Sequence, residues 1–155
     1  MPEKKDGERE KDVAVNRRAY HDYFVDEKYE CGVVLTGTEV KSMRIGRCNL
    51  RDGYVRIDRG EAWLENVHIS PYAQGGVMNH EPLRPRKLLL HRKQISSLIG
   101  KVRQKGYTLI PLRAYFARNH AKVEIGLARG KRQYDKREAI AARDAKREIE
   151  RAVRR

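Results

Sequence analysis

Residues 122–137 read KVEIGLARGKRQYDKR, and the change of composition inside this stretch decides how the chain divides. Val123, Ile125 and Leu127 alternate with less apolar neighbours, which is the period of a half-buried β-strand. After Gly130, strongly apolar residues become rare and charged residues dominate. The pattern predicts that a folded body ends near Gly130 and that a basic arm follows it.

The charge of the chain indicates its class of partner. The 155 residues suffice for one domain with its own core, and the 35 Lys and Arg residues exceed the 21 Asp and Glu residues by 14. Such an excess attracts phosphate backbones and favours binding by counterion release, so we expect a nucleic-acid partner. No apolar run approaches the roughly 20 residues that cross a bilayer, and the charged N-terminus is unlike a secretion signal. We expect a cytoplasmic protein that does not contact membranes.

The two ends of the chain differ from its middle. Residues 1–12 are almost wholly charged, and we expect a disordered N-terminal extension before a body of residues 13–130. Residues 131–155 contain ten basic and five acidic residues. Their few apolar side chains offer too little apolar surface to stabilise an isolated helix. We therefore expect this tail to be disordered when free and helical against nucleic acid. A helix docked on the body and a merely solubilising tail are the alternatives.

The first half of the body predicts short elements joined by turns. Asn16 is a suitable N-cap for one or two helical turns, and residues 29–35 alternate as a strand. Thr36-Gly-Thr-Glu39 fits a capping box that opens a short helix. Residues 50–69 predict a β-hairpin, and the Gly- and Pro-rich residues 71–85 predict a long loop.

The second half predicts one clear helix and two long strands. Residues 91–105 place apolar residues at helical spacing against a basic face, and strands are expected at 107–117 and 122–128. Pro111 cannot donate to a strand ladder, so it belongs at an edge or a bulge. About six strands with two or three short helices and no βαβ alternation predict an all-β domain with minor α. Either a closed or nearly closed antiparallel barrel or a sandwich fits this pattern.

The chain lacks the spacings of a metal site or a catalytic motif. The five histidines are scattered, Cys31 and Cys48 have no CxxC spacing, and residues 126–132 are one residue too short between glycines for a phosphate loop. We expect no metal, no cofactor and no catalytic residues. The enzymatic alternative is a nuclease that uses His21 and Glu30 as an acid–base pair.

Tyr134 lies beyond the last predicted strand, where no core is available to it. Its neighbours are the cations Lys131, Arg132, Lys136 and Arg137. Aromatic rings among cations offer stacking faces for nucleobases, so we expect Tyr134 to stack on a base.

Several ungapped segments in one order resemble the small protein B (SmpB) family, the bacterial protein partners of transfer-messenger RNA (tmRNA). The segments are NRRA (16–19), HDYF (21–24), YECGVVLTGTEVKSMR (29–44), RKLLL (86–90) and GKRQYDKR (130–137). The resemblance implies an oligonucleotide-binding (OB) type closed barrel. It also implies trans-translation, the rescue of ribosomes stalled on messages without a stop codon.

The resemblance implies partners and roles as well. The body would bind the transfer-RNA-like domain of tmRNA as a monomer, and the complex would engage elongation factor Tu with alanyl-tmRNA and then the ribosome. The tail would enter the empty mRNA channel as a helix. The residues implied in tmRNA binding are Asn16, Arg17, Arg18, His21, Glu30, Arg86, Lys87 and Leu90. Those implied in the decoding centre and channel are Lys131, Arg132, Tyr134, Asp135, Lys136, Arg137, Ile149 and Val153.

Many members of the family carry a histidine where this chain has Tyr134, and tyrosine keeps the stacking face but not the imidazole charge. A general OB-type RNA chaperone or ribosome-associated protein is the alternative to an adaptor for tmRNA. A chaperone would bind many RNAs with little preference among them. Competition between the transfer-RNA-like domain and bulk tRNA therefore distinguishes a chaperone from an adaptor.

Overall fold

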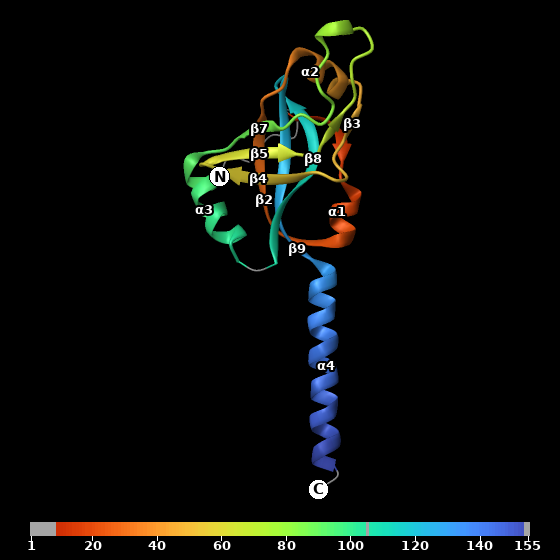
Figure 1. Cartoon of the computed structure of the whole chain (residues 1–155), viewed down its shortest axis with the longest axis vertical. Coiled ribbons are helices and arrows are strands. Elements are labelled where there is room, and N and C mark those ends of the chain that lie inside the picture. Colours follow the sequence, from red (N-terminus) through yellow and green to blue (C-terminus); the bar gives the residue numbers. More distant parts are fainter. Residues whose placement is uncertain (1–8, 105, 154–155) are drawn as a thin grey trace.

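A long helix extends away from a β-rich body in the computed structural model, which describes residues 9–104 and 106–153 (Figure 1). The strands are β1 (Arg9–Val15), β2 (Tyr23–Val33), β3 (Cys48–Asn49), β4 (Tyr54–Asp58), β5 (Glu61–Glu65), β6 (His68–Ile69), β7 (Arg86–Leu89), β8 (Tyr107–Ala117) and β9 (His120–Gly130). The helices are α1 (Arg17–Asp22), α2 (Gly37–Arg44), α3 (Arg92–Val102), α4 (Lys131–Val153) and the 3₁₀ turn η2 (Gly76–Met78). The chain is therefore mostly β with minor α, as predicted.

Seven strands form one antiparallel sheet in the order β1-β8-β9-β2-β7-β5-β4, and β3 pairs with β6 in a second sheet. The described residues contain nine strands, where the sequence predicted about six. The additional strands include β1, β3 and β6. Strands β3 and β6 have two residues each and are too short to show a period of two, and β1 is too charged to show one. Strands β2, β8 and β9, each of 11 residues, form the centre of the larger sheet.

The core lies against these central strands. Leu109, Ala114, Val123 and Ile125 of β8 and β9 pack in one buried cluster with Val55 of β4. A smaller cluster on the side of α1 is made by Ala19, Ile110, Leu112 and Ala128. Successive side chains of a strand point to opposite sides, so Leu109 and Ile110 of β8 lie in different clusters. Both faces of β8 are therefore buried. The ladder between β8 and β9 shifts register between Pro111 and Arg113, which confirms that Pro111 sits at a bulge.

The predicted disordered extension of residues 1–12 is wrong for its last four residues. Arg9 to Val15 form β1, which pairs with β8 from Arg9↔Ala117 to Val15↔Arg113. The edge of β8 satisfies the backbone of this charged segment, and Val13 and Ala14 pack against the core. The charge pattern of residues 9–12 could not reveal this pairing, because the partner lies about a hundred residues away. Residues 1–8 lie outside the described residues.

Local signals placed the helices of the body well. The Asn16 Oδ1 accepts a hydrogen bond from Ala19 N at 3.2 Å and so caps α1. The capping box of Thr36 and Glu39 is present, with Thr36 N donating to Glu39 Oε1 at 2.8 Å. In α3, Leu98 is fully buried at the centre of the apolar stripe. Amphipathic spacing and caps are properties of adjacent residues, which is why these predictions were confirmed.

The described side chains of helix α4 are not part of the hydrophobic core. The helix leaves β9 at Gly130 and points away from the body (Figure 1). Residues 140–153 are all exposed, including Ile149 and Val153 at 65% and 79%. The side chains of residues 132–139 are outside the described part of the structure. In the structure β9 ends at Gly130 and α4 begins at Lys131.

Candidate nucleic-acid interface

Three of the predicted RNA-binding residues lie together on α1. Arg17, Arg18 and His21 are exposed, and the His21 side chain is 87% exposed. Asp22 organises two of them: its carboxylate accepts from His21 Nδ1 at 2.8 Å and from Arg18 Nε at 3.1 Å. The hydrogen bond from His21, with smaller help from Arg18, lowers the pKa of Asp22. The helix thus presents a basic surface with two of its side chains already oriented.

Asn16 does not belong to that surface. Its side chain is 5% exposed, and its Nδ2 donates to Leu50 O at 3.2 Å and to Pro111 O at 2.9 Å while Oδ1 caps α1. Every polar atom of this amide is used inside the protein. The expectation that Asn16 lies in the RNA-facing surface is corrected: Asn16 anchors α1, and thereby positions its exposed cations.

Glu30 is exposed on β2, where a chain of contacts crosses the sheet. The Tyr115 hydroxyl of β8 donates to the Glu30 carboxylate. The guanidinium of Arg113 lies 5.3 Å from the centre of the Tyr115 ring and donates to Glu124 Oε2 at 2.5 Å. Burial, with the adjacent Glu30, raises the pKa of Tyr115 well above its usual range. Tyr115 therefore remains a hydrogen-bond donor that holds the Glu30 carboxylate in place on the surface.

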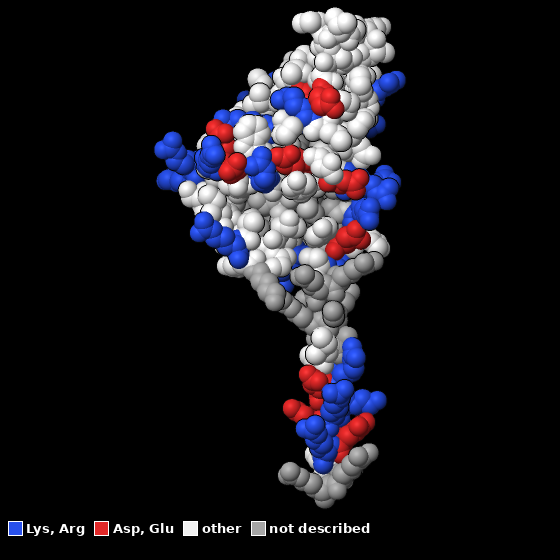
Figure 2. Space-filling view, in the orientation of Figure 1, with Lys and Arg blue, Asp and Glu red and all other residues white. Residues whose placement is uncertain are grey.

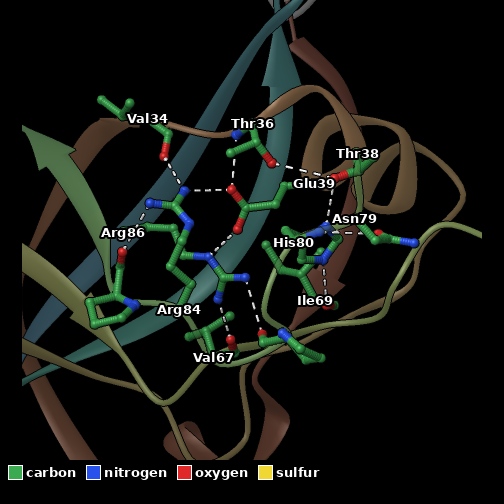
Figure 3. Close-up of polar contacts among 12 residues, drawn as sticks. Val34, Thr36, Thr38, Glu39, Val67, Ile69, Asn79, His80, Arg84 and Arg86 are labelled. Atoms are coloured by element: carbon green, nitrogen blue, oxygen red, sulfur yellow. Dashed lines mark hydrogen bonds and ion pairs between the residues drawn. The ribbon is translucent and has the colours of Figure 1, made fainter. Parts of the chain in front are cut away.

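Arg86 was expected to bind RNA, and the structure contradicts this. Its side chain is fully buried, as is that of Glu39. Arg86 Nε donates to Glu39 Oε2 at 2.5 Å, and its terminal nitrogens donate to Val67 O at 2.5 Å and Pro82 O at 3.1 Å (Figure 3). Arg86 is inward because alternate residues of β7 face opposite sides. The resemblance to the family implied that Arg86 binds RNA, but a resemblance in sequence does not show which face of the strand is buried.

The Glu39 carboxylate is the centre of a polar network beneath α2. It accepts from Arg84 at 2.5 Å as well as from Arg86 and Thr36 N (Figure 3). His80 extends the network, with Nδ1 2.8 Å from Thr38 Oγ1 and Nε2 2.8 Å from Ile69 O. The network ties α2 to β7 and to the loop of residues 71–85. It thus fixes two segments that the chain separates by about 40 residues.

The Glu39 network makes the stability of the fold depend on acidic pH. Burial alone would raise the pKa of Glu39, but hydrogen bonds from Arg84, Thr36 N and Arg86 outweigh it and lower the pKa below 4.5. A carboxyl group with a lowered pKa stabilises the fold above its unfolded pKa and loses that contribution as pH falls through the folded value. We expect the free energy of unfolding of the native chain to exceed that of Glu39→Gln most near neutral pH, and the difference to shrink below pH 4.5. Urea unfolding of both proteins across this range checks it, and a constant difference would contradict it.

Lys87 and Leu90 are both partly exposed. The Lys87 side chain is 42% exposed on the outer side of β7, and its Nζ donates to Glu61 Oε1 at 3.1 Å. Leu90 is partly buried and packs against the main core cluster. Lys87 lies within β7 and Leu90 directly follows that strand, so both are on a different element from the cations of α1.

The predicted tail residues follow directly from the end of β9. Lys131 Nζ donates to Tyr20 O at 3.0 Å and lies 5.3 Å from the centre of the Phe24 ring, so the start of α4 is held to α1 and β2. The backbone of residues 132–137 is helical, and their side chains are outside the described part of the structure. Ile149 and Val153 are exposed near the end of α4.

A cavity of about 480 Å³ beside α1 adds residues that sequence reasoning missed. It lies between α1, the turn that precedes β4, and β8. Arg51 and Tyr54 line it together with Arg18, and Tyr54 is 45% exposed. Arg51 and Tyr54 follow no motif, and no local pattern could bring this turn beside a helix more than 30 residues earlier.

The described side chains form no cluster suited to a metal ion, and His21 and Glu30 have separate partners. Among them, no group of three His, Cys, Asp or Glu residues is placed to hold a metal ion. His21 is bonded to Asp22, and Glu30 accepts from Tyr115, so each of the two residues of the nuclease alternative has a different partner. The thiols of Cys31 and Cys48 are free, and burial raises their pKa to about 12 and about 11, which makes them unreactive. None of the described helices is both long and apolar enough to cross a membrane.

Comparison with known proteins supports the family resemblance that the segments quoted above carry. The sequence model of the family described as "SmpB protein" matches residues 13–155. The SsrA-binding protein of Carboxydothermus hydrogenoformans is 63% identical over 145 residues, which are 94% of this chain and 97% of that protein. The SsrA-binding protein of Roseiflexus castenholzii is 64% identical over 145 residues, covering 93% and 92% of the two chains.

A solved structure agrees in fold as well as in sequence. The structure described as "tmRNA-SmpB: a journey to the center of the bacterial ribosome" is 52% identical and superposes with a TM-score of 0.66. The match covers 76% of this chain and 83% of the other. With a family match over residues 13–155 and relatives of about the same length, the chain belongs to the SmpB family.

Proposed function

We propose that this protein is an RNA-binding adaptor of trans-translation, which binds the transfer-RNA-like domain of tmRNA and delivers it to stalled ribosomes. The observation that carries the proposal is the near full-length identity of 60–64% to proteins named SsrA-binding proteins. A net charge of +14 supports it, because an RNA partner supplies the matching charge. The proposed partners are tmRNA, the ribosome, and elongation factor Tu with alanyl-tmRNA. The protein acts as a monomer in the cytoplasm, where ribosomes are, and as a stoichiometric partner rather than a catalyst.

The proposed RNA-facing surface of the body is made from exposed and partly exposed side chains. Its members are Arg17, Arg18, His21, Glu30, Lys87 and Leu90. The charged members bind phosphates or base edges, and Tyr115 holds Glu30 in position. Asn16 and Arg86 act through the fold alone, because Asn16 anchors α1 and Arg86 anchors β7.

The body is proposed to be a closed OB-type barrel. Its first and last strands, β1 and β4, stand at the two ends of the order of the larger sheet. The turn before β4 approaches β8 so closely that a Cβ on Gly53 would lie 2.8 Å from Pro111 Cγ. Val55 of β4 also shares a core cluster with Leu109 of β8. These contacts support a sheet that curves until β4 reaches β8, which is next to β1.

The tail is proposed to act in the decoding centre and the empty mRNA channel. Lys131, Arg132, Asp135, Lys136 and Arg137 would bind the decoding centre, Tyr134 would stack on a base there, and Ile149 and Val153 would line the channel. The proposed division is a body that ends at Gly130 and the tail of residues 131–155. The exposure of residues 140–153 supports the idea that α4 needs a partner to bury any of its surface.

The isolated tail is expected to be mostly disordered. Among the described side chains of α4, the large apolar ones are Ile140, Ile149 and Val153, and they offer little surface to stabilise a helix in water. Circular dichroism of a peptide of residues 131–155 measures this directly. A peptide with Ile149→Ala and Val153→Ala serves as control, because it removes apolar area without changing charge. A stable helix in both peptides without RNA would contradict folding on binding.

Competition binding tests the proposed function against a general RNA chaperone. The labelled transfer-RNA-like domain is bound to the protein and displaced with unlabelled domain or with bulk tRNA. We expect bulk tRNA to displace it only at concentrations about 100-fold higher or more, because specific nucleic-acid binding typically exceeds non-specific binding by at least 1,000-fold. Equal displacement by the two competitors would favour a chaperone that binds many RNAs. Cleavage of the RNA that is lost in His21→Ala would favour the nuclease.

A further inference from the structure

The base of the arm is held where β9 meets α4, and the central residue there is Arg129. Its register partners on the two neighbouring strands are both aromatic, Phe24 of β2 and Tyr107 of β8. The Arg129 guanidinium lies 5.9 Å from the centre of each ring. Arg129 Nε lies 3.1 Å from Asp26 Oδ2, and a terminal nitrogen donates to Asp26 Oδ1 at 3.3 Å. The direction of this side chain is therefore fixed by two rings and a carboxylate.

An irregularity of the sheet places Asp26 for this contact. The ladder between β2 and β9 shifts register between Val25 and Glu27, so Asp26 is the extra residue of a bulge. A bulge turns a side chain out of the regular alternation of its strand. Here the Asp26 carboxylate meets Arg129 and also accepts from the Tyr107 hydroxyl at 2.9 Å.

Lys131 adds a second connection at the first residue of α4. Its Nζ donates to Tyr20 O and lies over the Phe24 ring, as described above. Tyr20 belongs to the last turn of α1, where carbonyl groups lack partners within the helix and a cation is favourable. The start of α4 is thus tied to the helix that carries the cations of the proposed RNA-facing surface.

These contacts fix a geometry more than they stabilise the fold. The Arg129 and Asp26 side chains are 40% and 30% exposed, and ion pairs at the surface contribute little to stability. The same guanidinium nevertheless has contacts from β2 and from β8, which are the strands on both sides of β9. Several weak contacts that converge on one side chain restrict the path of the chain at this point.

The rest of the arm depends on this base for its direction. Among the described side chains of the arm, Lys131 contacts the body and those of residues 140–153 are all exposed. Lys and Arg alternate with Asp and Glu along the described end of α4, and the helix continues away from β9 (Figures 1 and 2). Forming the first turn is the costly step of helix formation, so contacts at the first residue also favour a helix that starts in one direction.

We propose that Arg129 is a positioning residue, which with Asp26 and Lys131 sets the direction in which α4 leaves the body relative to RNA bound at α1. The proposal rests on the proposed function, since rescue requires the arm to reach the mRNA channel while the body holds RNA. At 1.5 Å of rise per residue, the 23 residues of α4 span roughly 34 Å, so a change of about 20° at the base displaces the far end by roughly 12 Å. An error of that size is larger than the diameter of the helix backbone and would keep the arm out of a narrow channel.

The test uses the full chain and removes the contact from each side. Arg129→Gln removes the guanidinium, Asp26→Asn removes its counter-charge, and the double variant removes both. Arg56→Gln is the matched control, because the Arg56 side chain is 44% exposed on β4 and donates to Glu65 Oε1 from two nitrogens at 3.1 and 2.9 Å. Thermal unfolding verifies that each variant folds. If an Arg129 variant does not, Tyr107→Phe, which keeps the ring and removes only the hydroxyl that holds Asp26, takes its place.

Three measurements separate positioning from binding. Fluorescence anisotropy gives the affinity for a transcript of the transfer-RNA-like domain. Peptidyl transfer to alanyl-tmRNA at saturating concentrations of the complex gives rescue without a contribution from binding. Residual dipolar couplings of the amides of residues 131–133 in the free chain give the direction of the first turn of α4 relative to the body.

We expect unchanged RNA affinity in all variants and a loss of saturated rescue by roughly 10-fold in Arg129→Gln and in Asp26→Asn. The double variant is expected to lose no more than either single variant, because both residues act through one contact. The couplings of residues 131–133 should fit the direction of α4 in the native chain and in Arg56→Gln, and average toward zero in the other variants.

Unchanged rescue, or single losses that multiply to roughly 100-fold in the double variant, would overturn the proposal. So would a loss of rescue with native couplings, which would mean that Arg129 itself contacts the ribosome, or an equal loss of RNA affinity and rescue. Failure of the native chain to bind the transcript or to rescue ribosomes would instead refute the proposed function. The couplings then decide alone whether the cluster directs α4, and equal couplings in the native chain and the variants would overturn that as well.

Discussion

A chain truncated after Gly130 is expected to bind the transfer-RNA-like domain of tmRNA almost as tightly as the full chain and to rescue no stalled ribosomes. Residues 140–153 are exposed, and Ile140, Ile149 and Val153 bury little surface on the body. Removing α4 therefore leaves the core clusters intact, and with them the cations of α1. The truncation tests the proposed division between a body that binds RNA and a tail that acts only on the ribosome.

Two measurements on the same preparation check this prediction. Fluorescence anisotropy gives the affinity for the RNA, and peptidyl transfer to alanyl-tmRNA in a reconstituted translation system gives rescue. The matched control keeps the length, charge and composition of the tail but scrambles the order of residues 131–155. We expect this control to bind RNA and to fail in rescue, because order rather than charge positions the tail. Equal loss of RNA binding and rescue on truncation would refute the division of labour.

Removal of the Glu39 carboxylate is expected to destabilise the body by about 3–5 kcal/mol. Glu39→Ala leaves the fully buried Arg86 guanidinium without its counter-charge, and it also removes the acceptor of Thr36 N. Breaking a buried pair from one side costs this much because the remaining charge stays desolvated. Because the network joins α2, β7 and the loop of residues 71–85, the loss should loosen all three.

Urea unfolding measures the effect, and two variants make it specific. Arg84→Gln removes the partner of Glu39 that is 36% exposed, and we expect a smaller loss, because an exposed ion pair contributes only about 0–1 kcal/mol. Glu39→Leu combined with Arg86→Met removes the buried pair from both sides and is expected to recover much of the stability lost in Glu39→Ala. A loss below about 1 kcal/mol in Glu39→Ala would show that water reaches Arg86 and would contradict the prediction.

Much of the fold was predictable because its signals are local. The cap at Asn16, the capping box of Thr36 and Glu39, and the amphipathic α3 depend on residues within one or two helical turns of each other. The period of two in residues 122–128 likewise identified the end of β9. β1 was missed because its charged residues become a strand only by pairing with β8. Pairing over such a separation leaves no trace in the composition of the segment.

The candidate site was predictable in part for the same reason. Arg17, Arg18 and His21 share one short helix, so their grouping follows from its period. The family resemblance placed Asn16 and Arg86 on the surface, but both are buried, because burial is decided by contacts with distant segments. Arg86 is inside because Val67, Pro82 and Glu39 supply acceptors from three other segments. Arg51 and Tyr54 were missed because only the fold brings their turn to α1.

The sequence by itself determined that this is a basic, mostly β protein whose apolar pattern gives way to a charged arm after Gly130, because charge, strand period and helix caps are properties of neighbouring residues. Only the tertiary structure decided which polar side chains face solvent. Burial of Arg86 against Glu39 and exposure of the α1 cations both depend on which segments pack together, and packing joins residues that the chain keeps far apart.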